Sequence, residues 1–363
     1  MAKQSGALAV LHGFQAMRGI FALLVVCHHV SVHAARYWDY NWLGGLFYHS
    51  IFRVDFFFVL SGFVLWGSHR SDAGQCGMAQ RFLWRRAWRI YPLLITLTLF
   101  KLLLLALVPG RSLGSYQIIP SLLALPQKSF PIIVAAWTMS FEVFFGALMA
   151  ACLMLPRKVV LPALLTTGGL LVGTGVRQGI SPAISGPGFF VHPFILEFLA
   201  GVVAAEWVRQ RGSRTWGIAL CAAALGGLIA GNFQHAWLSD HSVLWQKGFW
   251  AAVFSLGLAG LALFERSVVP ENWRLKDIGN LGRASYSIFL AHGFVLMAVF
   301  AFVDPDMLRN QPLLMDLFLF LAAALAVLFG MAVWKWWEQP LSRWCKPMAQ
   351  TLQVRCESPQ QAS

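Results

Sequence analysis

The stretch RGIFALLVVCHHV, residues 18–30, decides how the whole sequence is interpreted. It holds a cation, Arg18, and an imidazole, His29, separated by ten mostly apolar residues. If the stretch is helical, eleven steps of about 100° make about three turns, so both side chains lie on one face, about 16 Å apart along the axis. Placing both groups inside an apolar membrane helix is costly, so we expect each of them to serve a function.

The composition of the 363 residues indicates the solvent around this chain. Hydrophobic residues make up 58% of the sequence, charged residues make up 12%, and the mean hydropathy is +0.63. Long apolar runs recur throughout, which is typical of a polytopic membrane protein in a lipid bilayer. Because these runs do not alternate with polar residues, the sequence predicts membrane helices rather than a barrel, and hence an all-α fold class.

Ten apolar segments are long enough to be predicted as transmembrane helices. They cover residues 14–34, 46–68, 88–108, 133–155, 159–176, 189–208, 215–231, 248–264, 285–303 and 313–336. Most of the 28 Lys and Arg residues then fall in every second connecting loop. By the positive-inside rule, these loops and both termini are predicted to be cytoplasmic.

The net charge of +13 does not indicate a nucleic-acid partner. The basic residues are spread over short loops between apolar segments, where they act as topology determinants. The spans leave room for a single transmembrane domain, residues 1–344, followed by a short polar cytoplasmic tail, residues 345–363. None of the six cysteines falls in a predicted outer loop, so no disulfide framework is expected.

Two ionisable residues are predicted near the outer ends of the first two spans. His29 lies late in span one, and Asp55 opens span two, so we expect them at similar depth. A carboxylate beside an imidazole fixes its tautomer and raises its basicity. The alternatives are an interfacial histidine and an entry anchor formed by Arg53 with Asp55. His33 lies one turn after His29, but no further ligand accompanies this pair, so no metal is expected.

The segment RFLWRRAWRIYP, residues 81–92, is predicted to be a basic inner loop. Arg81, Arg85 and Arg89 repeat at every fourth residue and form one basic face, to which Arg86 adds a further guanidinium. Positive-inside anchoring explains part of this pattern. Four arginines in nine residues exceed what topology requires, and Arg is the fork-shaped donor for phosphates. An anchor and a cytosolic, polyphosphorylated ligand therefore remain as two hypotheses.

Other polar residues lie within predicted spans and are expected to face the bundle interior. Glu142 and Glu197 fall near the middle of their spans, and Glu197 is equally explained as an interhelical hydrogen-bonding group. His292 lies about two turns into span nine, and a structural and a functional role explain it equally well. Glu338 lies at the inner end of span ten, where its carboxylate would hold the helix end or pair with a nearby Arg. Gly62, with its neighbour Ser61, would let another helix approach closely.

Together these groups indicate a polar route across the membrane. Such a route permits two classes of protein. One is a transporter or flippase. The other is an enzyme whose donor enters from the cytosol and whose acceptor waits outside.

In seven places the sequence resembles the acyltransferase-3 family of integral membrane acyltransferases. Arg18 and His29 match its pattern of an Arg, ten residues and a His, and Arg53 replaces a Gly that is usual before Val54 and Asp55. The matching segments are Arg18–His29, Arg53–Phe63, Arg81–Pro92, Trp137–Glu142, Glu197–Gly201, Ser285–His292 and Glu338–Pro340. The resemblance is strongest to members that act on exopolysaccharide or similar sugars without a fused soluble esterase-like domain.

The resemblance implies an activity and a location. A membrane-bound O-acyltransferase would move an acyl group, most often acetyl, from cytosolic acyl-CoA to a hydroxyl of an extracytoplasmic carbohydrate, such as an exopolysaccharide or lipid-linked glycan. The location implied is the bacterial cytoplasmic (inner) membrane. A transporter or flippase that uses the same polar route remains the alternative.

The resemblance also implies roles for particular residues. His29 would be the general base, oriented by Asp55 or Glu142, and direct transfer and an acyl-histidine relay both stay open. The residues implied in binding the acyl-CoA donor are Arg18, Arg81, Arg85, Arg86, Arg89 and His292.

Overall fold

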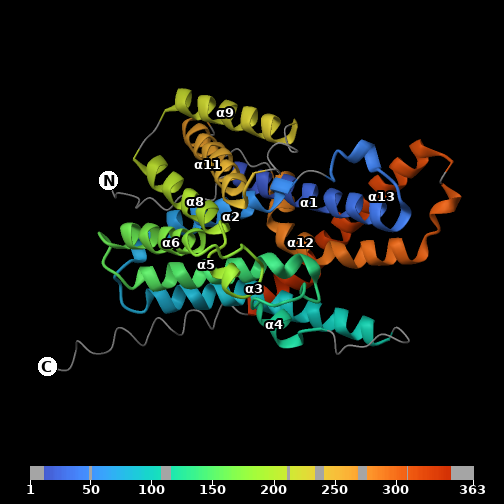
Figure 1. Ribbon diagram of the computed structural model, residues 1–363, viewed down its shortest axis with the longest axis horizontal. Helices are drawn as coiled ribbons and strands as arrows, with labels where there is room; N and C mark the ends of the chain where they lie inside the picture. The colour runs from blue at the N-terminus through green and yellow to red at the C-terminus, as the bar shows by residue number, and fades with distance from the viewer. Residues whose placement is uncertain are drawn as a thin grey trace.

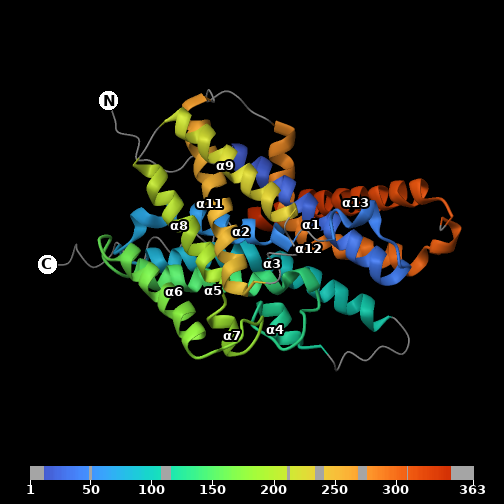
Figure 2. The ribbon, with the colours of Figure 1, turned by 45° about the horizontal axis from the view of Figure 1, so that its top comes forward.

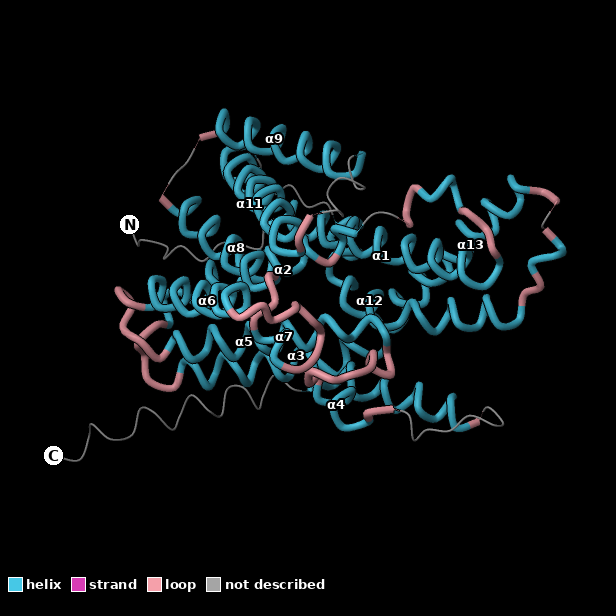
Figure 3. The backbone as a smooth tube through the Cα atoms, in the orientation of Figure 1, coloured by secondary structure: helices cyan, strands magenta, loops and turns pink. Residues whose placement is uncertain are grey.

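The computed structural model describes residues 12–48, 51–107, 116–210, 213–233, 241–268, 276–308 and 310–344. Within these ranges the chain is helical and contains no β-strand, as the tube in Figure 3 shows. The predicted all-α fold class is therefore confirmed. The predicted polar tail, residues 345–363, lies outside the described residues.

The described α-helices follow one another with short connections. They are α1 His12–Trp38, α2 Asp55–His69, α3 Met78–Ala106, α4 Ile118–Leu123, α5 Trp137–Leu153, α6 Val160–Arg177, α7 Pro187–Phe190, α8 Phe194–Arg209, α9 Arg214–Phe233, α11 Val243–Val268, α12 Lys276–Phe302 and α13 Pro312–Val333. The last of these continues into a π-helical turn, η7 Trp334–Glu338.

Nine helical stretches in the described part of the chain are long and apolar enough to cross a membrane. The one predicted span without such a stretch is the second, residues 46–68, which corresponds to α2; this helix has only 15 residues and follows the 3-10 turn Ile51–Arg53. Fifteen helical residues rise about 22 Å, less than the hydrocarbon thickness of about 30 Å. Helix α2 packs against α8 and α11, so these helices and not lipid surround much of it.

The helices pack as three groups, which Figure 1 and Figure 2 show from two directions. One group contains α2, α8, α9 and α11, a second contains α1, α12 and α13, and a third contains α3, α5 and α6. The second group extends to the right of both views. The groups meet where α1, α2, α3, α5 and α12 adjoin, and this junction holds the candidate site.

Helices α2 and α8 cross at two glycines. A Cβ atom on Gly62 would lie 1.9 Å from the carbonyl oxygen of Phe198, and one on Gly201 would lie 1.9 Å from that of Val59. Only glycine allows two helix backbones to approach so closely. The prediction that Gly62 permits close approach of another helix is confirmed.

The basic segment, residues 81–92, is helical, so its prediction as a loop is wrong. It forms the first half of α3, and Pro92 lies inside that helix. Arg, Leu and Ala are good helix formers, which lowers the cost of extending the helix beyond the apolar residues. The Tyr286 hydroxyl donates to the Ile90 carbonyl oxygen at 2.7 Å, which fixes α3 against α12 near the proline. The 29 residues of α3 span about 43 Å, longer than the hydrocarbon core.

Helices α1 and α12 run side by side in the same direction. A Cβ on Gly282 would lie 1.9 Å from the Gln15 carbonyl oxygen, so the two backbones touch there. Further along both helices Arg18 meets Ser285, and beyond them His29 meets His292. This register brings two of the segments singled out in the sequence, one near each end of the chain, into direct contact.

Candidate functional site

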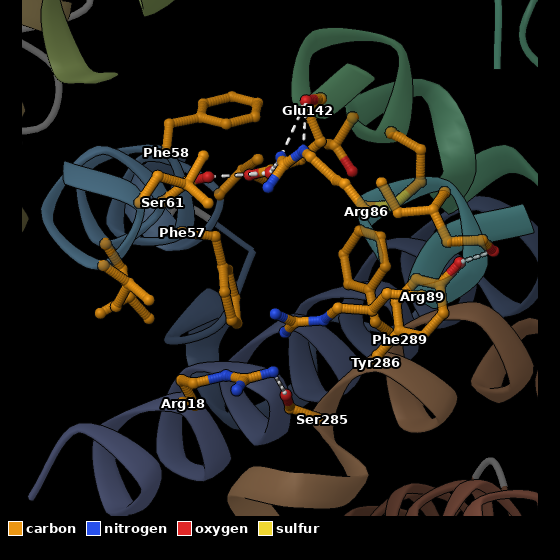
Figure 4. A pocket seen from close by; sticks show the side chains of 17 residues that line it. Arg18, Phe57, Phe58, Ser61, Arg86, Arg89, Glu142, Ser285, Tyr286 and Phe289 are labelled. Atoms are coloured by element: carbon orange, nitrogen blue, oxygen red, sulfur yellow. Dashed lines mark hydrogen bonds and ion pairs between the residues drawn. The ribbon is translucent and has the colours of Figure 1, made fainter. Parts of the chain in front are cut away.

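A cavity of about 160 Å³ lies where the three helix groups meet (Figure 4). Helices α1, α2, α3, α5 and α12 all contribute to its lining. Cationic side chains line one part, while another part is apolar and includes Val54, Phe57, Phe58 and Phe289. We refer to this space as the central cavity.

Two arginines from different helices extend into the central cavity. Arg18 donates to the Ser285 hydroxyl at 3.0 Å, and Arg89 reaches the same space from α3 (Figure 4). Among the described residues neither guanidinium forms an ion pair with a carboxylate. Two neighbouring cations that have no ion-paired carboxylate repel each other, so this part of the cavity is electrostatically suited to an anion.

A third arginine of the cavity is already ion-paired. Arg86 forms a salt bridge with the Glu142 carboxylate and donates to the Glu142 backbone carbonyl at 2.8 Å. The Ser61 hydroxyl donates to the same carboxylate at 2.9 Å. Gly146, one turn after Glu142, makes room for the Arg86 stem, since a Cβ there would lie 2.6 Å from Arg86 Nε. This cluster joins α2, α3 and α5, and among the described contacts its carboxylate meets Arg86 and Ser61 and not His29.

The basic face of α3 divides between the cavity and its surroundings. Arg86 and Arg89 line the central cavity, whereas Arg81 and Arg85 line neither of the two cavities described here. Arg81 and Arg85 lie about two turns and one turn before Arg89, on the same side of the helix but closer to its N-terminus. A role for Arg81 and Arg85 in donor binding stays a prediction.

A second cavity of about 520 Å³ adjoins the first, and we call it the vestibule. The two share Arg18, Arg89 and Tyr286 as lining residues. Arg283, on α12, and Arg343, after η7, also line the vestibule. Four guanidiniums therefore line the vestibule, whose volume can hold an extended anionic ligand.

Glu338 is the one carboxylate that lines the vestibule in the described part of the chain. It lies at the end of η7 and accepts a hydrogen bond from the Ser287 hydroxyl at 2.5 Å. Single π-helical turns are rare in proteins, and those that occur are often found at functional sites. Of the two explanations that the sequence left open, this contact supports a role in holding the end of α13 against α12.

His29 and His292 form a pair beyond the central cavity. Their ring centroids lie 5.0 Å apart, His29 on α1 and His292 on α12. His292 is buried, with 3% of its surface exposed, while His29 is half-buried and so more accessible. The sequence predicted His292 as a donor-binding residue without predicting its contact with His29.

Hydrogen bonds fix the tautomer of His292. Its Nδ1 lies 3.1 Å from the Ile288 carbonyl oxygen, which can only accept, so Nδ1 carries the proton. The neutral ring then presents Nε2 as an acceptor. His28 and His33 are fixed in the same way, by the carbonyl oxygens of Phe47 and His29 respectively. The described hydrogen bonds tie no carbonyl or carboxylate to the ring of His29, which leaves it available for a ligand.

Asp55 does not contact His29, contrary to our expectation. Its Oδ1 lies 2.5 Å from Lys247 Nζ, on α11, and fully buried Glu197 lies close to this pair. Arg53 donates instead to the Phe47 carbonyl oxygen at 3.3 Å, so the alternative of an Arg53–Asp55 anchor is also not observed. Asp55 is drawn to Lys247 because a buried carboxylate requires a nearby cation.

Two aromatic rings connect the lining of the central cavity to the histidine pair. The rings of Phe57 and Phe289 lie 6.4 Å apart, and the Phe289 ring lies 6.4 Å from that of His292. Both phenylalanines line the cavity, and neither histidine does. Phe289 is therefore the lining residue through which the cavity adjoins the histidine pair.

Sequence reasoning missed several residues of this site. Lys247 directly precedes the predicted span 248–264, so the sequence places it in a loop. Phe57 and Phe289 resemble the many other apolar residues in their helices. Ser285 and Tyr286 lie inside a segment that had been singled out, which was the available signal for them. Only the packing of the helices distinguishes these side chains.

Comparison with known proteins agrees with this architecture. A family model described as an acyltransferase domain matches residues 11–335. The exopolysaccharide production protein ExoZ of Rhizobium meliloti (strain 1021) is 31% identical over 305 residues, which cover 80% of this chain and 89% of the relative. No solved structure matches the chain at a significant level.

Proposed function

This chain belongs to the acyltransferase-3 family and is a multi-pass membrane acyltransferase, and on that premise we propose that it acylates an exopolysaccharide or a related extracytoplasmic carbohydrate. The proposed donor is cytosolic acyl-CoA, with acetyl-CoA preferred. The similarity to an exopolysaccharide production protein supports the carbohydrate acceptor. The proposed location is the bacterial cytoplasmic membrane.

One observation carries this proposal. Four guanidiniums line the vestibule, two of them also line the adjoining central cavity, and Phe289 of that cavity contacts His292 of the His29–His292 pair. A transfer between substrates from opposite sides of a membrane needs a binding site for an anion at one end and a base at the other.

The residues present fit the phosphates of a CoA donor. Arg18 and Arg89 have no carboxylate partner among the described residues, and Arg283 and Arg343 extend the cationic lining outward. Guanidinium groups bind phosphate with two parallel hydrogen bonds, so they fix its orientation as well as its charge. We assign Arg18 and Arg89 to the donor phosphates nearest the thioester, and Arg283 and Arg343 to its more distant phosphates.

His29 is proposed as the general base. It would accept the proton of the acceptor hydroxyl while the hydroxyl oxygen forms a bond to the acyl carbon and the carbon–sulfur bond breaks. The proton finally resides on the released thiol, so the reaction is balanced without a further reactant. His292, held by the Ile288 carbonyl, positions the His29 ring.

The test compares two adjacent histidines in cells. A strain lacking the protein would be complemented with the wild type, His29→Ala or His28→Ala, and the acyl content of its surface polysaccharide measured by NMR. We expect His29→Ala to lower acylation about 10²-fold or more, and His28→Ala to retain it, because general bases typically contribute 10²–10⁴-fold. Unchanged acyl content with His29→Ala would rule out His29 as the base.

A further inference from the structure

We propose that Phe57 and Phe289 determine the size of the acyl group that this protein transfers, admitting acetyl and excluding longer chains. The inference rests on the proposed function, since it concerns the acyl end of the same donor. The observation behind it is that the two rings line the central cavity and contact each other, and that Phe289 also contacts His292.

The direction of the donor follows from the charges. The guanidiniums that would hold its phosphates lie in the vestibule and the adjoining part of the central cavity. The acyl group, at the opposite end of the molecule, must then point toward His29 and His292. The side chains that it meets in that direction are Phe57 and Phe289, whose ring centroids are 6.4 Å apart.

Phe57 is held where all three hydrophobic clusters of the molecule meet. It packs against the cluster of α2, α5, α8 and α11, against that of α1, α12 and α13, and against that around α3 and α12. Its ring also contacts that of Phe56 at 5.4 Å, and Phe56 in turn stacks on Phe21 at 4.0 Å. Displacing Phe57 would disturb each of these contacts, so the ring forms a fixed wall.

Phe289 forms the facing wall. It is buried, with 8% of its surface exposed, and belongs to the cluster around α3 and α12. Its ring lies 6.4 Å from His292, so its position is coupled to that of the histidine pair. Protein interiors are close-packed, and an extra methylene beside two such rings requires side chains to move.

The size of the effect follows from discrimination in apolar pockets. One methylene changes the preference between two substrates by about 10–200-fold. Replacing either phenylalanine with alanine removes a ring from the wall and opens space beside the thioester. We therefore expect the wild type to prefer acetyl-CoA, and both alanine variants to accept butyryl-CoA better by about tenfold or more relative to acetyl-CoA.

The experiment uses the purified full-length protein in lipid nanodiscs. Acetyl-, butyryl- and hexanoyl-CoA would be supplied as donors, and exopolysaccharide from cells lacking the protein as acceptor. The rate of free-thiol release gives kcat/KM for each donor with the wild type, Phe57→Ala and Phe289→Ala. Phe294→Ala is the matched control, because Phe294 is a buried phenylalanine of α12 that does not line the cavity.

A folding control accompanies these rates. Free CoA has no acyl group, so it should compete with labelled acetyl-CoA equally well for the wild type and each folded variant. Where an alanine variant fails this control, the leucine variants Phe57→Leu and Phe289→Leu decide the question, with a smaller shift in the same direction.

The outcomes separate this inference from the proposed function. A shift toward longer chains in the Phe57 or Phe289 variants, and not in Phe294→Ala, supports it. An unchanged chain-length profile, or an equal shift in Phe294→Ala, overturns it while acyl transfer by the wild type still supports the proposed function. A folded wild type that transfers no acyl group from any of the three donors overturns both.

Discussion

The Lys247 ammonium lies 2.5 Å from the Asp55 carboxylate and so joins the start of α11 to the first residue of α2. Both side chains are largely buried, with 13% and 1% of their surfaces exposed. The Lys247 ammonium also lies 4.7 Å from the centre of the Phe194 ring, on α8. The Lys247 ammonium therefore connects α2 to two neighbouring helices, α8 and α11, and α2 is too short to span the membrane by itself.

Breaking this ion pair should destabilise the protein. Asp55→Asn or Lys247→Met alone leaves a buried charge without its partner, and we expect a loss of about 3–5 kcal/mol in the free energy of unfolding. The double variant should recover much of this loss, because neither charge remains. Thermal unfolding of the detergent-solubilised protein measures the effect. Arg209→Met, which removes the exposed half of the pair with Glu206, is the control and should cost less than about 1 kcal/mol. Losses that simply add in the double variant would contradict the ion-pair explanation.

The crossing of α2 and α8 should tolerate no side chain at Gly62. An added Cβ would overlap the Phe198 carbonyl oxygen, so Gly62→Ala must push the helices apart, at a cost of about 1–3 kcal/mol or more. Gly169, on α6, has no atom near an added Cβ, and Gly169→Ala should be neutral or slightly stabilising. Melting temperatures of the two variants make the comparison, and equal values would show that the close approach is not rigid.

The guanidinium of Arg89 should affect the KM only of donors that carry phosphates. We expect Arg89→Ala to raise the KM for acetyl-CoA by about tenfold or more, because charged hydrogen bonds contribute about 1.5–3 kcal/mol. The KM for acetyl-pantetheine, which has no phosphate, should change little. Initial rates with both donors test this, and Arg157→Ala, in the connection between α5 and α6, controls for a general loss of charge. An equal effect on both donors would assign Arg89 to another part of the donor. The same comparison on Arg85→Ala would show whether the first turns of α3 take part.

Glu142 should prove to be a positioning residue whose main contact is Arg86. Glu142→Ala leaves the buried Arg86 guanidinium without a carboxylate and should cost about 3–5 kcal/mol and most activity. Ser61→Ala retains the Arg86–Glu142 pair and should cost about 1 kcal/mol. In the double variant Glu142→Gln/Arg86→Gln, thermal stability should recover, and the measured kcat shows whether activity returns with it. Recovered stability without activity would instead support the role in orienting His29 that the resemblance implied for Glu142.

Hydrophobic patterning predicts most of this fold because membrane helices form locally. Each span must satisfy its own backbone hydrogen bonds, so a long apolar run is sufficient evidence for a helix. The same criterion fails at the ends of helices. Hydropathy predicted that the third span begins at residue 88 and the eighth at residue 248. Both helices begin earlier, at Met78 and Val243, because charged residues lower the hydropathy there without ending the helix.

The site was predictable as a set of residues and not as an arrangement. Arg18, Arg89 and Glu142 line the central cavity, as their place in the spans suggested, and His29 lies beyond it. The partner of each was not predictable. Asp55 was expected beside His29 and contacts Lys247, while Glu142 contacts Arg86 and Ser61.

The sequence by itself determined that this chain is an all-α membrane protein, that it resembles one acyltransferase family, and that buried polar groups mark its function. Those properties depend on composition and on residues close together in the chain. Only the tertiary structure decided that His29 faces His292, that Arg18 meets Ser285, and that the rings of Phe57 and Phe289 pack together. These contacts join residues more than 200 positions apart, and their geometry depends on which helix faces pack together, which the close approaches at Gly62 and Gly282 set.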